Sequence, residues 1–322
     1  MILIVGGAGY IGSHVNKLLS EMGYQTVVFD NLSTGHRESV KWGELVEGDL
    51  ANIHEIENVF TKYNMEAVLD FASFIEVGES VVDPQKYYQN NVVNSLNLLG
   101  VMKKFEVNKI VFSSTAAVYG NPQKVPIVED SPLLPINPYG KTKLMLEMIF
   151  ADYDKAYGLK SVCFRYFNAC GADRDGEIGE GHTPESHLIP RILKYAKGEL
   201  PEFKLFGTDF ETKDGTCVRD YIHVEDLAKA HLMGLKHLLN SGESKIFNLG
   251  SGSGYSNKEI ANAAREVTGV DFEINYGPRR AGDPAILLAD TTKIKTEWNW
   301  EPEYKDIKVI LQTAWQWEQK QK

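Results

Sequence analysis

Near its N-terminus the chain reads Ile2-Leu3-Ile4-Val5-Gly6-Gly7-Ala8-Gly9-Tyr10-Ile11-Gly12. The short β-branched run predicts a buried strand, the glycines predict a tight turn, and the pattern from Ser13 to about Met22 predicts a helix. Two glycine spacings overlap here, Gly7-x-Gly9-x-x-Gly12 and Gly6-x-x-Gly9-x-x-Gly12. Because glycine has no Cβ, a pyrophosphate can come close to the N-terminus of that helix. A strand, a glycine turn and a helix in this order predict a dinucleotide-binding turn.

A carboxylate stands at the end of the next apolar strand. Thr26-Val27-Val28-Phe29 is followed by Asp30, eighteen residues after Gly12. A carboxylate at this place accepts hydrogen bonds from both hydroxyls of an adenosine ribose and repels a 2′-phosphate, which favours NAD over NADP. Two other interpretations stay open: Asp30 can simply cap a turn, and Arg37 in the following loop can contact a 2′-phosphate.

Strands and helices alternate through the first half of the chain. We predict strands at 45–50, 67–72, 110–112 and 162–164, and helices at 84–105 and 138–157. Such alternation implies a parallel sheet with helices on both faces. The predicted fold class is therefore α/β, with a Rossmann-type, doubly wound parallel sheet over residues 1–166.

The second half is less regular and predicts a smaller, mixed α/β substrate domain over residues 167–322. Residues 168–185 are rich in glycine and charge, which predicts a loop. Further elements are expected as helices at 186–197, 226–239, 257–268 and 307–318 and as short strands at 219–224 and 247–249. The segment of about 218–248 is expected to return to the Rossmann sheet.

The composition of the chain indicates which kinds of partner, compartment and metal site to expect. The net charge is −10 with no basic tract, so no nucleic-acid partner is expected. Cys163, Cys170 and Cys217 form no Cys-x-x-Cys pair, which predicts a reducing compartment without a disulfide or zinc framework. No apolar run is long enough for a signal segment or a bilayer span, so we expect a cytoplasmic protein without membrane contact. His182 and His187 lack His-Glu-x-x-His spacing, and no metal site is expected.

A second motif lies at Asn137-Pro138-Tyr139-Gly140-Lys141-Thr142-Lys143. Asn137 is a helix cap and Pro138 suits the first helical position. Tyr139 and Lys143 are four residues apart and so share one face of the helix. An ammonium near a phenol favours the phenolate, which makes the tyrosine a usable base. Such a pair is also common by chance, and its meaning depends on the other motifs.

Together these motifs resemble the extended short-chain dehydrogenase/reductase family, and within it the enzymes that interconvert UDP-glucose and UDP-galactose at C4. The resemblance extends over nearly the whole chain in the family's order. Besides the two motifs above, it rests on Gly48-Asp49-Leu50, Val77-Gly78-Glu79-Ser80, Ser113-Ser114-Thr115-Ala116-Ala117-Val118-Tyr119-Gly120, Arg165-Tyr166-Phe167-Asn168, Asp214-Gly215-Thr216, Arg219-Asp220-Tyr221-Ile222-His223-Val224 and Arg279-Arg280-Ala281-Gly282-Asp283.

The resemblance implies a reaction and a set of site residues. Tyr139 would take the proton of the sugar 4-hydroxyl, Thr115 would hydrogen-bond the 4-oxygen, and Lys143 would hold the nicotinamide ribose. A tightly bound NAD would take and return the C4 hydride through a 4-keto sugar. Cofactor-contacting positions match Gly6, Gly7, Gly9, Tyr10, Ile11, Gly12, Asp30, Asn31, Asp49, Leu50, Phe71, Ala72, Asn90, Ser113, Tyr139, Lys143 and Tyr166. Positions that contact the UDP-sugar match Thr115, Tyr139, Asn168, His187, Leu188, Phe206, Arg219, Tyr221, Arg280 and Asp283.

The resemblance also implies a homodimer and a role in galactose metabolism, and it comes with two departures. Ile75 stands where many members carry a lysine that contacts NAD. Leu287 stands where many members carry a tyrosine that gates the sugar pocket. Leucine leaves more room than tyrosine, so some turnover of UDP-N-acetylglucosamine is expected.

Three alternative functions stay open. A nucleotide-sugar 4,6-dehydratase would need an acidic pair after Thr115, where this chain has Ala116-Ala117. An enzyme acting on a UDP-uronic acid would need a residue that binds the sugar carboxylate. A non-catalytic NAD-binding regulator is disfavoured, because Tyr139 and Lys143 are both present.

Overall fold

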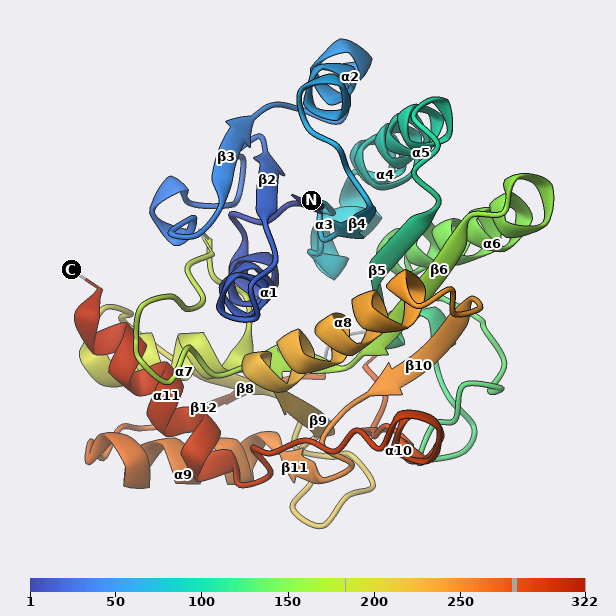
Figure 1. Ribbon diagram of the computed structural model, residues 1–322. Coiled ribbons are helices and arrows are strands. Elements are labelled where there is room, and N and C mark those ends of the chain that lie inside the picture. The colour runs from blue at the N-terminus through green and yellow to red at the C-terminus, as the bar shows by residue number, and fades with distance from the viewer. Residues whose placement is uncertain (183, 280–282, 322) are drawn as a thin grey trace. The chain divides into compact units, whose positions relative to one another are not determined.

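The computed structural model describes residues 1–182, 184–279 and 283–321 (Figure 1). The chain forms two compact units. Unit 1 contains Met1–Gly120, Pro132–Arg165 and Ala228–Phe247, and unit 2 contains Asn121–Ser131, Tyr166–Leu227 and Asn248–Lys322. Within the described ranges, no helix combines the length and the apolar character that a bilayer crossing requires.

Unit 1 is built on a seven-stranded sheet. In chain order its strands are β1 (Ile2–Val5), β2 (Thr26–Asp30), β3 (Glu44–Glu47), β4 (Ala67–Asp70), β5 (Lys109–Thr115), β6 (Lys160–Tyr166) and β10 (Lys245–Leu249). Their spatial order is β10-β6-β5-β4-β1-β2-β3, and the pairs β1–β2, β1–β4, β2–β3 and β4–β5 are parallel. The order reverses beside β1, as in a doubly wound sheet. The predicted fold class is confirmed.

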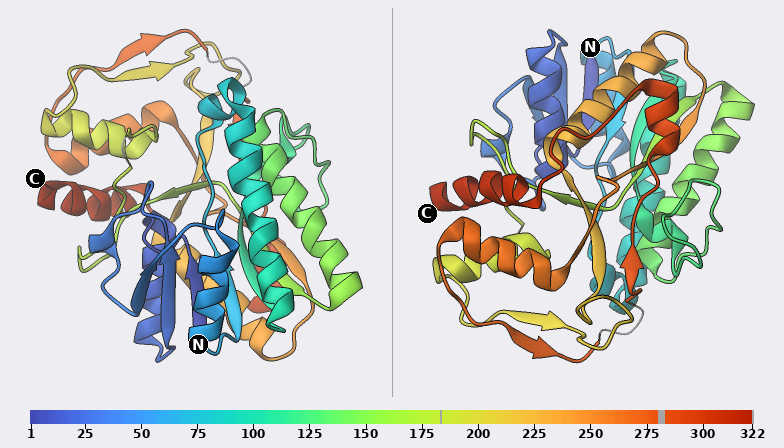
Figure 2. Two further views of the ribbon diagram at one scale, coloured as in Figure 1. Left: turned by 90° about the horizontal axis from the view of Figure 1, so that it is seen from above. Right: turned by 90° about the horizontal axis from the view of Figure 1, so that it is seen from below.

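Helices cover both faces of this sheet (Figure 1). They are α1 (Tyr10–Glu21), α2 (Ile53–Lys62), α3 (Val77–Val82), α4 (Pro84–Tyr87), α5 (Asn94–Lys104), α6 (Pro138–Tyr157) and α8 (Val224–Leu239), with short 3₁₀ turns η1 (Arg37–Ser39) and η3 (Ala116–Tyr119). The helix predicted at 84–105 is interrupted by a π-helical stretch, η2 (Tyr88–Val93). Both views of Figure 2 show α5 beside α6.

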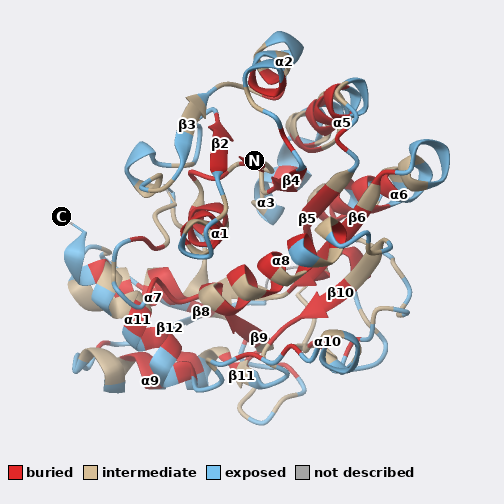
Figure 3. Cartoon of the chain, viewed as in Figure 1, coloured by how far each residue is buried: buried red, intermediate tan, exposed pale blue. Residues whose placement is uncertain are grey.

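The inner strands of the sheet are buried on both faces, because alternate residues of a strand point to helices on opposite sides, whereas the edge strand β3 has no buried residue (Figure 3). Leu3, Val27 and Val68 belong to the core that α2, α5 and α6 complete. On the other face, the ring of Phe164 packs 4.9 Å from that of His231 in α8. This burial on both faces explains why the strands read as continuous apolar runs in the sequence.

Unit 2 contains shorter strands and its own helical core. Its strands are β7 (Asn168–Cys170), β8 (Lys204–Phe206), β9 (Val218–His223), β11 (Gly254–Ser256), β12 (Asn275–Gly277) and β13 (Ile286–Leu287), and its helices are α7 (Leu188–Lys197), α9 (Asn257–Thr268), α10 (Thr292–Trp298) and α11 (Ile307–Lys320). Strand β9 pairs with β7, β11 and β13, and β8 pairs with β12. The loop predicted at 168–185 was wrong at its start, because 168–170 pair in parallel with 221–223 of β9.

Candidate active site

The glycine turn joins β1 to α1 and depends on missing Cβ atoms. Gly6 has φ +74°, and a Cβ there would lie 2.7 Å from the amide nitrogen of Ala72. A Cβ on Gly12 would lie 2.5 Å from the carbonyl oxygen of Gly6. No side chain caps α1, and no acidic residue lies in its first turn. The amides at this helix end are therefore suited to an anionic group such as a pyrophosphate.

Asp30 ends β2 beside this turn. Its Oδ2 accepts a hydrogen bond from the Ala8 amide at 2.9 Å, and its Oδ1 accepts one from the Leu32 amide at 2.8 Å. Burial raises the pKa of Asp30, and the two backbone hydrogen bonds oppose this shift. Arg37, the alternative contact for a 2′-phosphate, instead forms an ion pair with Glu47 of β3. The site thus presents a buried carboxylate where the sequence predicted a ribose partner.

The other predicted cofactor positions gather at one edge of the sheet. Asn31, Asp49, Leu50, Phe71, Ala72, Ser113 and Tyr166 lie at or just beyond the carboxyl ends of β2 to β6, whereas Asn90 lies in η2. Asn31 donates to Asp49 through Nδ2 at 2.8 Å. The carboxyl edge of a doubly wound sheet is where this fold binds its ligands.

Tyr139, Lys143 and Thr115 come together where α6 passes the end of β5. The predicted cap is confirmed: Asn137 Oδ1 accepts the Gly140 amide at 2.8 Å, and Pro138 is the first helical residue. A Cβ on Gly140 would lie 2.6 Å from the carbonyl oxygen of Ala117, so this glycine permits a close approach of α6 to η3. Tyr139 is partly buried, and its phenol is hydrogen-bonded to Thr115.

Lys143 is almost completely buried, with 1% of its surface exposed. Its Nζ donates to the Ser113 carbonyl oxygen at 2.7 Å and to Ser73 Oγ at 2.8 Å, and it lies 4.7 Å from the centre of the Phe112 ring. Burial lowers the pKa of Lys143 to about 8, although the charges of Asp70 and Glu147 oppose this shift. The end of β5 therefore positions the ammonium, which loses its proton at a lower pH than an ordinary lysine does.

The pKa of Tyr139 shifts in the direction opposite to the sequence-based expectation. Burial raises the pKa of Tyr139, the hydrogen bond with Thr115 opposes the rise, and the charge of Glu76 adds to it. Lys143 is not among the described groups that shift this pKa. Desolvation of the phenolate therefore sets the direction of this pKa shift.

Sequence reasoning missed the carboxylates beneath this group. Glu147, one turn beyond Lys143, accepts hydrogen bonds from Arg165 Nε at 3.0 Å and Nη2 at 2.6 Å, and from the Ser114 hydroxyl. Asp70 ends β4, and burial raises its pKa to about 6 while the charge of Lys143 opposes the rise. Both carboxylates are buried, and a buried charged residue indicates a structural or catalytic role.

The predicted substrate positions lie in unit 2, apart from Thr115 and Tyr139. Leu188, Phe206 and Asp283 line a cavity that is open to solvent, together with Ser186, Arg191, Phe203, Lys204, Leu205 and Asn257. Arg219 Nη1 donates to the carbonyl oxygens of Val218 and Pro284, each at 2.9 Å. Arg280 lies outside the described residues.

The remaining substrate positions of unit 2 do not line this cavity. Asn168 donates through Nδ2 to the Asp220 carbonyl oxygen at 2.8 Å, which joins β7 to β9. Tyr221 is buried in the core of unit 2. His187 Nδ1 pairs with Glu180 and Glu185. The cavity therefore contains only part of the predicted set.

Comparisons with known proteins agree with a redox site of this kind. A model of the NAD dependent epimerase/dehydratase family matches residues 2–250, and the chain belongs to this family. It is an enzyme whose cofactor is NAD.

Similar proteins narrow the class further. A UDP-glucose 4-epimerase of Rhizobium leguminosarum bv. trifolii is 49% identical, over 99% of this chain and 97% of the relative. The structure of UDP-glucose 4-epimerase from Brucella ovis in complex with NAD is 48% identical, with a TM-score of 0.95 over 98% of this chain and 97% of that one. The UDP-Glc/GlcNAc 4-epimerase of Campylobacter jejuni is 42% identical, with a TM-score of 0.87 over 99% of both chains.

Proposed function

We propose that this enzyme interconverts UDP-galactose and UDP-glucose by reversible inversion at C4, through a 4-keto sugar and with NAD retained. The observation that carries the proposal is that Thr115, Tyr139 and Lys143 come together at the end of β5. Relatives of nearly the same length named UDP-glucose 4-epimerase support the choice of substrate. Such an activity would serve galactose metabolism and the supply of sugar nucleotides.

Tyr139 and Thr115 handle the proton in this proposal. The phenolate of Tyr139 takes the proton of the sugar 4-hydroxyl while the C4–H bond breaks and a C4=O bond forms. Thr115, already hydrogen-bonded to the phenol, lies close enough to hold the same oxygen. The phenol then returns the proton to the 4-oxygen when the hydride is returned to C4 on its opposite face. The sum of the two halves is an inversion with no net oxidation.

Lys143 positions the reacting groups. NAD, when bound, accepts the hydride from C4 and returns it, and it brings a positive ring to the site. Lys143 reaches the end of β5, where a ribose hydroxyl could take one of its hydrogen bonds. We attribute the lowering of the pKa of Tyr139 that catalysis requires to the assembled complex, because burial raises this pKa in the protein alone.

Unit 2 would hold the uridine diphosphate. The cavity lined by Leu188, Phe206 and Asp283 offers apolar walls and a cation, Arg191, for this ligand. Arg219 lies close to the cavity residue Asp283 in the structure, with 3.8 Å between its Nη2 and Asp283 Oδ1. A guanidinium whose carboxylate partner is this distant can still take a phosphate oxygen.

The dehydratase alternative lacks its acid and base where that chemistry needs them. Residues 116 and 117 are alanines in η3, and Thr115 Oγ1 accepts the Ala117 amide at 3.1 Å. Elimination of water from C5 and C6 needs a further proton donor and acceptor there. The structure offers two methyl groups instead, which favours epimerisation.

Leu287 is the residue on which our proposal about N-acetylated sugars rests. It pairs with Arg219 in the register of β13 and β9 and is partly buried. Leucine leaves more room than tyrosine, and one of the similar structures is named a UDP-Glc/GlcNAc 4-epimerase. We therefore propose some turnover of UDP-N-acetylglucosamine beside UDP-glucose. Good turnover of UDP-galactose with none of the N-acetyl substrate would contradict this.

One experiment tests the reaction class, the substrate range and the retained cofactor together. The purified protein is incubated with UDP-galactose or with UDP-N-acetylgalactosamine, without added NAD, and the products are separated. We expect the 4-epimer of each sugar. A Tyr139→Phe variant should keep its bound NAD and lose nearly all turnover. Wild-type turnover in that variant would refute the assigned proton path.

We also propose that the enzyme is a homodimer that pairs through α5 and α6. Met145 and Met148 of α6 are 40% and 62% exposed, and Val93 of η2 and Leu96 of α5 are 43% and 38% exposed. Exposed apolar side chains gathered on two adjacent helices are typical of an interface. A second copy of the chain supplies the matching surface in a two-fold dimer.

A further inference from the structure

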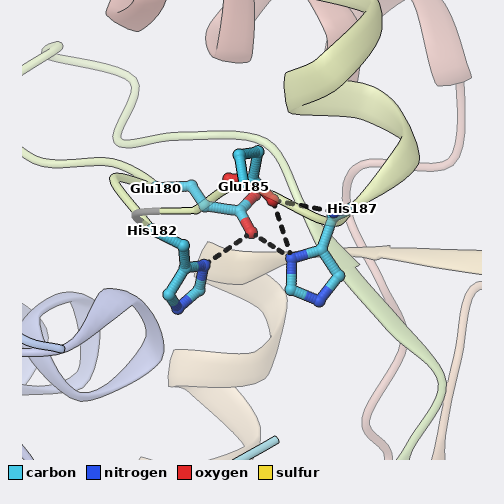
Figure 4. Close-up of side chains that lie close together, drawn as sticks. All are labelled: Glu180, His182, Glu185 and His187. Atoms are coloured by element: carbon cyan, nitrogen blue, oxygen red, sulfur yellow. Dashed lines mark hydrogen bonds and ion pairs between the residues drawn. The ribbon is translucent and has the colours of Figure 1, made fainter. Parts of the chain in front are cut away.

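Two histidines and two glutamates gather in the loop before α7. We call Glu180, His182, Glu185 and His187 the His/Glu cluster. One donor atom from each lies within 4.8 Å of the others. Figure 4 shows the Glu180 carboxylate between the two imidazoles, with Glu185 facing His187. The residues lie two, three and two positions apart, a spacing that matches no helical motif and that predicted no metal site.

The donor atoms already approach one another closely. Nδ1 of His182 lies 3.1 Å from Glu180 Oε1, and Nδ1 of His187 lies 2.8 Å from the same oxygen. His187 Nδ1 is also 3.2 Å from Glu185 Oε1. Ligand atoms around a tetrahedral zinc ion stand about 3.3 to 3.6 Å apart, given metal–ligand distances of about 2.0 to 2.2 Å. The three short contacts would each have to widen by less than about 1 Å to reach this spacing, and the other donor pairs lie within 4.8 Å.

Charge and hydrogen bonding also suit a cation. The glutamate side chains are only 8% and 5% exposed, and Glu185 Oε2 has no hydrogen-bond partner among the residues that the structure describes. Two buried carboxylates carry two negative charges, which a divalent ion with two neutral imidazoles would cancel. Buried carboxylates without full compensation are costly. A proton on His187 compensates only one of these charges.

The loop is held at both ends, so that the donors are fixed in place. Trp317 of α11 donates through Nε1 to the Glu180 carbonyl oxygen at 2.8 Å. Arg191 of α7 donates to the Glu185 carbonyl oxygen at 3.2 Å, and the His187 amide donates to Glu185 Oε1 at 2.7 Å. Such backbone anchoring is what orients metal ligands in protein sites.

We propose that the His/Glu cluster binds one divalent transition-metal ion, with Zn²⁺ as the best match to two imidazoles and two carboxylates. Imidazole selects zinc and its neighbours over magnesium and calcium, which prefer sites made wholly of oxygen. Bound there, the ion would tie the loop to the first residue before α7. Another acidic group, formed by Asp173, Asp175 and Glu177, has no nitrogen donor, and two of its members are exposed.

Metal binding is tested on the full-length, untagged enzyme with its nucleotide retained. Zn²⁺ is titrated against a coloured chelator, and Co²⁺ is added separately to record the absorption of its d electrons. We expect one tight site and the intense visible bands of cobalt in a tetrahedral site with nitrogen ligands. A His182→Gln variant should bind at least about tenfold more weakly.

Two control variants separate this site from surface binding. His54→Gln removes an exposed histidine that pairs loosely with Glu57, at 4.0 Å, and should bind Zn²⁺ as the wild type does. Asp175→Asn should do the same. No binding by the wild type would overturn the proposal and leave a protonated histidine as the cluster's counter-charge. Equal affinity of His182→Gln and the wild type for Zn²⁺ would overturn it as well. Weak cobalt bands of the octahedral type in the wild type would also overturn it, and this readout needs no variant.

Discussion

Replacing Lys143 with methionine should reveal the cost of burying this ammonium as a pH-dependent difference in stability. Burial lowers the pKa of Lys143 from 10.5 to about 8. Between those two values the unfolded chain holds a proton that the folded protein has released. Stability therefore rises with pH over this window and is lowest below it, where the folded protein must carry the buried charge.

The size of the effect follows from the two pKa values. For one such group the free energy of unfolding rises by about 1.3 kcal/mol between about pH 7 and about pH 9. The wild type should gain that much relative to Lys143→Met, which lacks the titrating group. Without the ammonium, the pKa of Asp70 rises further, since the charge of Lys143 holds it down. A carboxyl with a raised pKa loses stability as pH rises, so this change increases the same difference.

Urea unfolding at the two pH values measures the difference directly. NAD is first removed from both proteins, because a ligand that binds only the folded state adds its own free energy. Lys141→Met is the matched control, since Lys141 is exposed on the same helix and its removal should leave the pH dependence unchanged. If wild type and Lys143→Met keep a constant difference across the window, the lysine is not desolvated as the structure implies.

Three further predictions concern the same helix and its surroundings. Gly140→Ala should push α6 away from η3, since its Cβ would lie 2.6 Å from the Ala117 carbonyl oxygen, and kcat should fall by about tenfold to a hundredfold with NAD still bound; an unchanged kcat would contradict this. Glu76→Gln removes a charge that raises the pKa of Tyr139, so the acid limb of the kcat profile should move to lower pH, and a shift upward would show that the phenolate is not the base. Met148→Glu should convert the proposed dimer to a monomer in light scattering, whereas a wild type that is already monomeric would refute the interface.

Local signals in the sequence predicted the first strand, the glycine turn and the helix from Pro138 to Tyr157. That helix begins and ends as predicted because Asn137 caps it and Gly158, with φ +72°, ends it. The start of α1 was placed three residues late, since Tyr10 follows a glycine cap without a polar side chain. Signals of this kind lie within a few residues of the boundary that they set.

Features that depend on contacts between distant parts of the chain could not be predicted from local sequence signals. The strands β8, β12 and β13 are two or three residues long and exist only through their pairing. Asp70 stands at the end of an apolar strand with no local pattern to mark it. The His/Glu cluster forms because Trp317, more than a hundred positions away, anchors its loop. In each case the partner that defines the feature lies far along the chain.

Helix α6 shows why hydrophobic pattern alone would have placed its site wrongly. An ordinary surface helix buries apolar residues and exposes polar ones. This helix buries Lys143 and Glu147 and exposes Met145 and Met148. The buried charges are tied to the strand ends, Lys143 to Ser113 and Glu147 to Arg165.

The buried charges and the exposed methionines of α6 each have a physical cause. Burying an ammonium and a carboxylate lowers stability unless each finds partners, and here both do. Gly140, Lys143 and Glu147 are three and four positions apart, so they form one stripe that fixes how far the helix can turn. That stripe aims Tyr139 at Thr115. The methionines on the opposite side of α6 then remain in water unless another surface covers them. The orientation of α6 that builds the catalytic group therefore also creates the apolar face through which we propose that two copies pair.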